Sequence, residues 1–195
     1  LIVEKLGLRQ QQLFKNKLKY HLLGPKESRK ENDGFEKKNL ITFFGPTMIT
    51  KPIDDICNLI NSDYQLSKKF KYRFVNVSNA VIDSICKKVE SLEFVEFNQG
   101  YLDDKTYEKF ISESKFVFLP HNKLFEGKLS GILSDSISLG TPVISNNIEP
   151  VKEFFESYGP MGYIYDFQSD TNWTYSFLNS GFEEEYEYFK LNMKK

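Results

Sequence analysis

The sequence contains few of the residues and patterns that mark several large classes of protein. Its 195 residues include only two cysteines and two histidines, and neither their spacing nor any cluster of carboxylates matches a metal site. No apolar run approaches the ~20 residues that span a membrane, and the N-terminal LIVEKLGLRQ has charge within its apolar part, unlike a signal peptide. A formal net charge of −1 gives no electrostatic footprint for nucleic acid. We therefore expect no metal cofactor and no nucleic-acid partner.

The residues that are present are those of an ordinary soluble globular protein, with 40% hydrophobic, 27% charged and 15% aromatic residues. The length suits one domain with an appendage. Both cysteines, Cys57 and Cys86, fall in predicted helices, so we expect free, buried thiols in a reducing cytoplasm. No Ser/His/Asp or Cys/His catalytic set can be assembled from the sequence.

From Asn39 onward, short β-rich runs alternate with helical patterns. The expected strands are Leu40–Phe44, Arg73–Val77, Leu92–Phe97, Phe116–Leu119, Pro142–Ser145 and Tyr163–Tyr165. The expected helices are Ile53–Ser62, Ala80–Ser91, Asp103–Ser114, Ser130–Leu139, Val151–Tyr158 and Phe182–Asn192. This alternation predicts an α/β fold, a Rossmann-like three-layer α/β/α domain with a mostly parallel, doubly wound sheet of about six strands.

We divide the chain into three parts. Residues 1–38 form a polar lead with an amphipathic helix at Val3–Leu23, residues 39–168 form the Rossmann-like domain, and residues 169–195 form a helical extension. In open parallel sheets, ligands bind at the carboxyl ends of the strands. The polar loops that follow the strands are therefore the candidate binding site.

The most informative stretch is KFVFLPHNKLFEGKLSGILSDSISLGTPVIS, from Lys115 to Ser145. An apolar strand ends at Pro120, and a loop with Glu126-Gly127 and Ser130-Gly131 then leads into a helix that stops before a Gly-Thr-Pro turn. Bare backbone N–H groups and the positive end of a helix can bind an anion there. A carboxylate beside an anion site suits a hydroxylated group next to a phosphate, which is the combination found in sugar nucleotides.

These residues resemble the nucleotide-sugar-binding C-terminal half of GT-B-fold glycosyltransferases of the group 1 (family 4) type. The family signature combines Pro, Glu-Gly, Gly, a second Glu and a final Gly-x-Pro-Val-Ile-Ala. The chain matches it with Pro120, Glu126-Gly127, Ser130-Gly131, Asp135 and LGTPVIS, residues 139–145. Counting from Glu126 would place Ser134 in the slot of the second Glu, whereas counting back from the Gly-Thr-Pro turn places Asp135 there. We prefer Asp135, because loops absorb insertions more readily than helices do.

The resemblance implies a role for each matched residue. Glu126 would contact hydroxyls of the transferred sugar, and Lys51, which keeps its family spacing from Gly45, would neutralise the leaving diphosphate. Glu126 and Lys51 are therefore the catalytic candidates. Asp135 would accept hydrogen bonds from the ribose hydroxyls. The further donor-binding candidates are Gly45 and Gly127, together with Lys128, Ser130 and Gly131, which would face the diphosphate. Pro46 departs from the family pattern because it stands where Arg is usual.

Two further donor-binding candidates have competing structural interpretations. Tyr101, in FNQGYLDD, could stack on a uracil base, with Gly100 supplying a positive φ, or it could simply pack at the start of a helix. His121 directly follows a strand and could meet phosphate or sugar, or it could be a structural residue. Asp135 could likewise only complement a helix dipole, and Lys51 could be a solvated residue before a helix.

The leading functional hypothesis is the nucleotide-sugar-binding lobe of a retaining hexosyltransferase, with a UDP-sugar as donor, in polysaccharide or glycoconjugate biosynthesis. The resemblance implies an N-terminal acceptor-binding lobe that this chain lacks, whether by truncation or because a partner supplies it. We expect donor binding with little transfer, a cytoplasmic location, and peripheral membrane association through a lipid-linked acceptor. If the helix at Phe182–Asn192 packs on the missing lobe, its aromatic face should be exposed. The alternatives are a degenerate, non-catalytic module that stabilises a partner subunit, and an epimerase or phosphorylase on the same scaffold.

Overall fold

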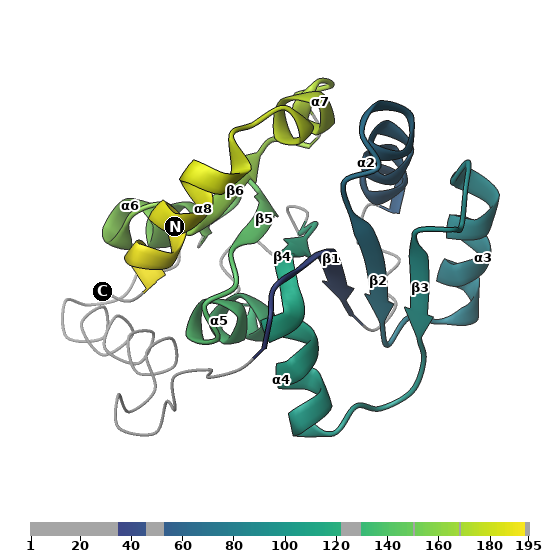
Figure 1. Ribbon diagram of the computed structural model, residues 1–195, viewed down its shortest axis with the longest axis horizontal. Coiled ribbons are helices and arrows are strands. Elements are labelled where there is room, and N and C mark those ends of the chain that lie inside the picture. The colour runs from purple at the N-terminus through teal and green to yellow at the C-terminus, as the bar shows by residue number, and fades with distance from the viewer. Residues whose placement is uncertain (1–34, 46–52, 122–129, 150, 168, 194–195) are drawn as a thin grey trace, which may run out of the picture.

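The computed structural model describes residues 35–45, 53–121, 130–149, 151–167 and 169–193. It contains a six-stranded sheet in the order β3-β2-β1-β4-β5-β6, and every neighbouring pair is parallel (Figure 1). The strands are β1 (Lys38–Phe44), β2 (Lys71–Val75), β3 (Val95–Asn98), β4 (Ser114–Leu119), β5 (Val143–Asn146) and β6 (Gly162–Tyr165). The strand order reverses direction between β1 and β4, which confirms the predicted doubly wound, Rossmann-like domain.

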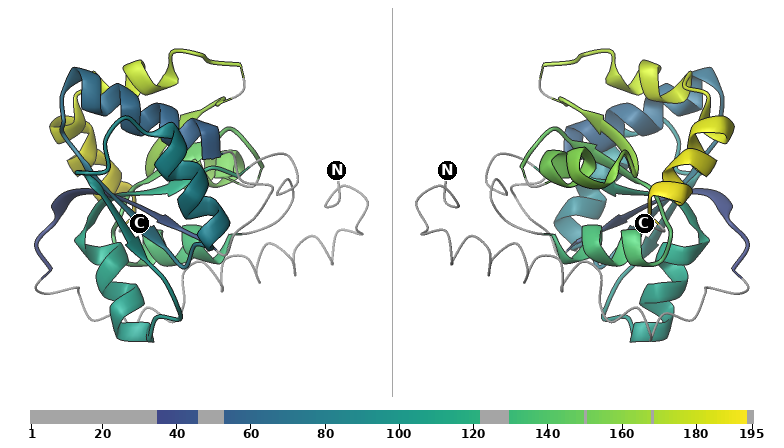
Figure 2. Two further views of the ribbon diagram at one scale, coloured as in Figure 1. Left: turned by 90° about the vertical axis from the view of Figure 1, so that its right-hand side faces the viewer. Right: turned by 90° about the vertical axis from the view of Figure 1, so that its left-hand side faces the viewer.

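Seven helices are described, and they cover both faces of the sheet (Figure 2). They are α2 (Ile53–Leu66), α3 (Asn79–Lys88), α4 (Asp104–Glu113), α5 (Gly131–Ser138), α6 (Val151–Tyr158), α7 (Trp173–Leu178) and α8 (Phe182–Met193). Buried residues of α2, α3, α7 and α8 share one apolar cluster, and those of α4, α5 and α6 share another. The helix expected at Val3–Leu23 lies outside the described residues.

Alternating side chains of the strands supply the two clusters. In β4, Phe116 and Phe118 belong to one cluster, whereas Val117 and Leu119 belong to the other, and all four side chains are at most 1% exposed. Successive side chains of a strand point to opposite faces, so a sheet covered on both faces needs an unbroken apolar run. The sequence FVFL in β4 meets that requirement.

Several element boundaries differ from those predicted. β2 ends at Val75 rather than Val77 because Asn76 has a left-handed backbone, with φ of 54°. β3 begins at Val95 rather than Leu92, since a turn occupies the residues before it. The sequence did not reveal α7, a six-residue helix whose buried Trp173 and Phe177 are one turn apart.

The C-terminal helices pack on the sheet through several aromatic rings. The rings of Phe177 in α7 and Tyr186 in α8 lie 5.5 and 5.8 Å from that of Phe116 in β4. Tyr186 and Phe189 are buried, although Tyr188 and Leu191 remain exposed. The expectation of an exposed aromatic face on α8 is therefore wrong for its two buried rings.

The two thiols differ in burial. Both cysteines are free, and Cys57 is buried as predicted, where burial raises its pKa to about 11. Cys86 is exposed, contrary to the prediction. It follows Ile85, which faces the core with Val81, and the next position of a helix points away from that face. A buried thiol is therefore correct for Cys57 alone.

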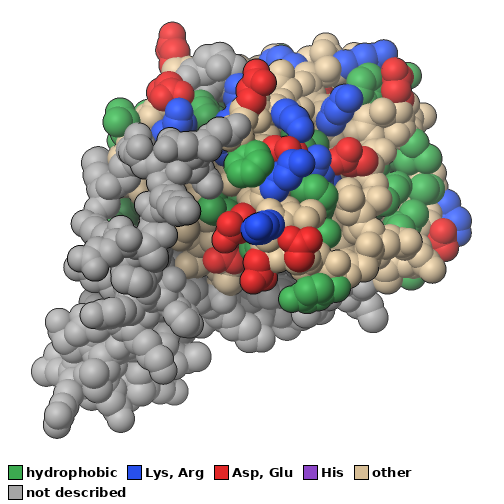
Figure 3. All heavy atoms as spheres, turned by 60° about the horizontal axis from the view of Figure 1, so that its bottom comes forward, with side chains coloured by type: hydrophobic (Ala, Val, Ile, Leu, Met, Phe, Trp, Pro, Cys, Tyr) green, Lys and Arg blue, Asp and Glu red, His purple; other side chains and the backbone are tan. Residues whose placement is uncertain are grey.

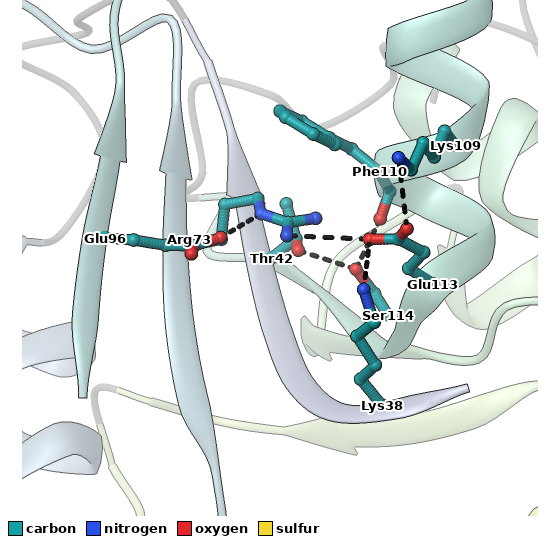
Figure 4. A network of polar contacts seen from close by, with 8 residues as sticks. All are labelled: Lys38, Thr42, Arg73, Glu96, Lys109, Phe110, Glu113 and Ser114. Carbon is teal, nitrogen blue, oxygen red and sulfur yellow. Dashed lines mark hydrogen bonds and ion pairs between the residues drawn. The ribbon is translucent and has the colours of Figure 1, made fainter. Parts of the chain in front are cut away.

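A buried carboxylate ties together the beginnings of β1, β2 and β4 (Figure 4). Glu113 is 8% exposed and forms ion pairs with Lys38 at 3.1 Å, Lys109 at 3.6 Å and Arg73 at 3.6 Å. Arg73 also pairs with Glu96 on β3. Burial alone would raise the pKa of Glu113, but these cations hold it below its usual value.

The charged surface is mixed in sign. On the face turned forward in Figure 3, Lys and Arg side chains lie beside those of Asp and Glu. Within the described residues, no helix has both the length and the apolar character needed to cross a membrane. The same part of the chain contains no group of three or more His, Cys, Asp or Glu residues that could hold a metal ion.

A second buried carboxylate, Asp63, fixes the loop between α2 and β2. It is 1% exposed and accepts hydrogen bonds from the backbone N–H of Lys69 and Phe70 at 2.9 Å each. It also accepts bonds from the hydroxyls of Ser67 at 2.7 Å and Tyr72 at 3.1 Å. Because it satisfies four donors, the loop depends on this one side chain.

Replacing Asp63 should therefore destabilise the fold. We expect Asp63→Ala to lower the free energy of unfolding by on the order of 3 kcal/mol, since buried donors lose a charged acceptor. Urea unfolding followed by circular dichroism measures this loss. Asp83→Ala, at an exposed position of α3, is the matched control and should change stability by less than about 0.5 kcal/mol. Equal effects of the two substitutions would contradict the role assigned to Asp63.

The buried amine of Lys37, just before β1, should make the stability of the fold depend on pH. Its ammonium group donates to the hydroxyl of Thr141 at 2.5 Å, and burial, together with the charge of Lys190, lowers its pKa from 10.5 to about 7. The unfolded chain thus binds more protons between these values, so this group makes stability rise with pH across that window. We expect Lys37→Met to stabilise the fold most below about pH 7, and its advantage in urea unfolding to shrink towards about pH 9. A pH-independent difference would contradict the burial of this amine.

Candidate donor-binding site

The carboxyl ends of the strands form one edge of the sheet, where most of the described site residues lie. Gly45 follows β1, and its buried backbone N–H donates to the carbonyl of Val75 at 3.2 Å, next to the end of β2. His121 follows β4 by two residues, and α5 begins at Gly131. The parallel sheet therefore places Gly45, His121 and the start of α5 at its carboxyl edge.

Asn146, at the end of β5, fixes this edge and was not singled out from the sequence. It is 6% exposed, and its amide nitrogen donates to the carbonyl of His121 at 2.9 Å. Its side-chain oxygen accepts from the backbone N–H of Asn147 at 2.9 Å and of Phe167 at 3.3 Å. One amide side chain thus joins the segments that follow β4, β5 and β6. The only sequence signal for this role was an Asn at the end of an apolar strand.

His121 is a buried residue of this edge. Its side chain is 3% exposed, and its backbone N–H donates to the carbonyl of Leu119 at 2.8 Å in a tight turn. Since its carbonyl accepts from Asn146, both backbone polar groups of His121 are hydrogen-bonded. Contact of its imidazole with a sugar or phosphate, expected from its place after the strand, stays a prediction.

The start of α5 has the geometry expected of an anion site. Ser130 is the N-cap residue, and its hydroxyl accepts from the N–H of Leu133 at 3.4 Å. Gly131 is exposed, and a Cβ atom at this position would meet nothing within 4 Å. The first N–H groups of a helix lack partners within it and carry partial positive charge. A ligand phosphate can therefore approach the backbone at Ser130 and Gly131.

Asp135 lies one turn into α5 and has a partner that the sequence did not predict. The hydroxyl of Tyr107 in α4 donates to its Oδ2 at 2.8 Å. Burial, with the carboxylate of Asp135 beside it, raises the pKa of Tyr107 above its usual value. Tyr107 also contacts Phe44 edge to face, at 5.2 Å between ring centroids. Asp135 is half-buried, whereas Ser134, the other residue considered for this slot, is 7% exposed.

Tyr101 stands apart from these residues. It follows β3, the outermost strand on its side of the sheet, and its side chain is 92% exposed. Gly100 has the expected positive φ, 92°. The side chain of Asp103 caps α4 by accepting from the N–H of Thr106 at 2.9 Å. Tyr101 is thus open to a ligand, and stacking on a base stays a prediction.

The remaining predicted residues lie outside the described part of the chain. They are Lys51, Glu126, Gly127 and Lys128, together with Pro46 in the position of the family Arg. The described residues therefore bring together Gly45, His121, Ser130, Gly131 and Asp135, and they add Tyr107 and Asn146. This arrangement can offer backbone N–H groups to an anion and a carboxylate to neighbouring hydroxyls.

Comparison with known proteins identifies the fold. No protein-family model matches the chain, and no curated protein sequence matches it. Its structure overlaps that of TarM with a TM-score of 0.61 at 16% identity, covering 85% of this chain and 33% of TarM. It overlaps WaaG, a glycosyltransferase involved in lipopolysaccharide biosynthesis, with a TM-score of 0.59 at 13% identity, covering 88% of this chain and 44% of WaaG.

A third match is to a single domain. The C-terminal domain of LpcC, a group 1 glycosyl transferase from Francisella tularensis, overlaps with a TM-score of 0.61 at 14% identity, covering 82% of this chain and 84% of that domain. The chain thus spans under half of WaaG and a third of TarM, but most of an isolated C-terminal domain. Its fold is that of the C-terminal lobe of GT-B glycosyltransferases.

Proposed function

We propose that the chain is the nucleotide-sugar-binding lobe of a retaining glycosyltransferase and that it takes a UDP-sugar. The observation that carries the proposal is the start of α5, where half-buried Ser130 and exposed Gly131 lie about one turn from the carboxylate of Asp135. Neighbours in structure support UDP as the nucleotide. The pneumococcal O-GlcNAc transferase GtfA forms a complex with UDP and GlcNAc, and a trehalose-phosphate synthase from Burkholderia vietnamiensis is UDP-forming.

In the proposed reaction, the bond between the sugar and the diphosphate breaks, and negative charge grows on the departing nucleoside diphosphate. Groups placed where charge develops stabilise the transition state. The backbone N–H groups at Ser130 and Gly131 would bind the diphosphate, with the side chains of Lys51 and Lys128 neutralising it. Asp135 would hold the ribose hydroxyls, and Glu126 would orient the sugar. Retention of configuration follows from the family resemblance.

The lobe alone would bind the donor without efficient transfer. In the proposed enzyme, an acceptor-binding lobe, supplied by the same protein or by a partner subunit, would close the site. We further propose a role in polysaccharide or glycoconjugate biosynthesis in the cytoplasm, with a lipid-linked acceptor at the membrane. The involvement of WaaG in lipopolysaccharide biosynthesis supports this choice of pathway class.

The alternative is a degenerate lobe that stabilises a partner transferase. Two observations favour it: Pro46 replaces the family Arg, and the hydroxyl of Tyr107 already occupies one oxygen of Asp135. A degenerate lobe would keep the fold and lose nucleotide affinity. Binding measurements therefore separate the two functions.

We expect UDP to bind the chain in calorimetric titration and Asp135→Asn to weaken that binding by about 10- to 100-fold. The substitution removes the negative charge from an acceptor of the ribose hydroxyls, and such charge-assisted bonds contribute about 1.5–3 kcal/mol. Asp83→Asn, on the exposed side of α3, is the control and should leave the affinity unchanged. No binding of UDP, UDP-glucose or GDP at millimolar concentration would contradict the proposal and favour the degenerate lobe.

Tyr107 should position Asp135 for the ribose. Tyr107→Phe keeps the ring against Phe44 and removes only the hydroxyl that orients the carboxylate. We expect UDP affinity to fall by roughly 5-fold, in line with one hydrogen bond, with little change in the affinity for 2′-deoxy-UDP, which lacks one ribose hydroxyl. An equal loss for both nucleotides would indicate a purely structural role for Tyr107. Tighter UDP binding would show that its hydroxyl competes with the ribose.

A further inference from the structure

The edge of the sheet where the strands begin carries two adjoining hollows of about 510 Å³ each. Asn39, Lys69 and Phe70 line both hollows, so the two form one groove across the beginnings of β1, β2 and β4. We call it the amino-edge groove. It lies on the edge opposite the candidate donor-binding site, and no role described above uses it.

The amino-edge groove is basic although the whole chain is close to neutral. Its lining contains six cationic side chains but only two carboxylates, Glu96 and Glu184. The cations are Lys38, Lys68, Lys69, Lys71, Arg73 and Lys115. Like charges gathered in a concave surface focus a positive potential and attract anions.

Some of these cations have partners within the protein, whereas others form no ion pair among the described residues. Lys38 and Arg73 pair with the buried carboxylate of Glu113 (Figure 4), and the ammonium group of Lys69 donates to the carbonyl of Leu178 at 2.7 Å. Within the described residues, neither Lys68 nor Lys71 forms an ion pair. Lys68 lies over the ring of Tyr64 at 4.6 Å, a contact that leaves its positive charge in place. At least two lysines can therefore meet an external anion.

The backbone of the loop that carries Lys68 and leads into Lys71, the first residue of β2, is held by specific contacts. Asp63 accepts the backbone N–H of Lys69 and of Phe70, as described above. Lys68 has a left-handed backbone, with φ of 49°, which is uncommon for a residue other than glycine. This residue follows the end of α2, and its backbone N–H donates to the carbonyl of Asp63 at 2.7 Å, as in a common helix C-terminal cap. The backbone that carries Lys68 and Lys69 is thus fixed, while the side chains of Lys68 and Lys71 are exposed.

We propose that the amino-edge groove binds a linear polyanion, a flexible polymer with repeated phosphate or sulfate groups. Two hollows in a row, with lysines along both, suit a chain of charges better than a single phosphate. The two aromatic residues of the groove, Phe70 and Phe94, are buried and partly buried, so they give no exposed platform for the bases of a nucleic acid. A concave surface also fits a polymer chain better than it fits a flat lipid layer.

The test is fluorescence anisotropy of the full chain with labelled short-chain inorganic polyphosphate, and in parallel with a labelled sulfated glycan, over a range of salt concentrations. The variant is Lys68→Gln with Lys71→Gln, and its control is Lys105→Gln with Lys152→Gln, which removes equal charge from exposed positions on α4 and α6. We expect only the first pair to weaken binding and to reduce the salt slope by about 2, one for each lysine. The stronger of the two polymers identifies the anionic group. The far-ultraviolet circular dichroism spectrum and the midpoint of urea unfolding should be the same in all variants, which confirms that they are folded whether or not the chain binds UDP.

Four results would overturn the proposal. The first is that neither polymer binds the chain at low salt. The second is that both pairs of substitutions weaken binding equally. The third is that an oligo-dT strand of matched charge binds more tightly than both polymers, which would assign the groove to nucleic acid. The fourth is that the chain sediments with anionic phospholipid vesicles but binds neither soluble polymer, which would assign the lysines to a membrane surface.

Discussion

Every strand of the sheet runs in the same direction, and helices cover both of its faces. This single constraint determines the composition of the strands and the position of every loop. Strands buried on both faces must be apolar throughout, as Phe116 to Leu119 are in β4. Most polar residues therefore lie near the two edges, where strands begin and end, although buried Thr42 and Arg73 lie within β1 and β2. The carboxyl edge carries the candidate donor-binding site, and the amino edge carries the basic groove.

Three buried polar side chains hold these edges in place. Asn146 joins the segments after β4, β5 and β6 at the carboxyl edge, through bonds to the backbone of His121, Asn147 and Phe167. Asp63 and Glu113 act at the amino edge, where each carboxylate satisfies several donors or cations. A buried charge is costly unless it is paired in this way. The loops at both edges are therefore fixed by a few specific contacts rather than by apolar packing alone.

The sequence predicted the order of the elements because apolar strand runs and helical periods are local patterns. It could not predict features that depend on the meeting of distant segments. β2 ends at a left-handed Asn76, and no glycine marks this position in the sequence. The helix α7 is stabilised by the packing of Trp173 and Phe177 and lacks a side-chain cap that the sequence could reveal. The bond between Tyr107 and Asp135 joins residues 28 apart in the chain, so only the packing of α4 on α5 reveals it. The roles of Glu126 and Lys51 still rest on the family resemblance.

The central claim is that the start of α5 binds a nucleoside diphosphate. A crystal structure of the chain soaked with UDP tests it most directly. We expect the diphosphate to lie against the backbone N–H groups at Ser130 and Gly131, with a ribose hydroxyl within hydrogen-bond distance of Asp135. UDP density elsewhere, for example in the amino-edge groove, with this edge of the sheet empty, would contradict it.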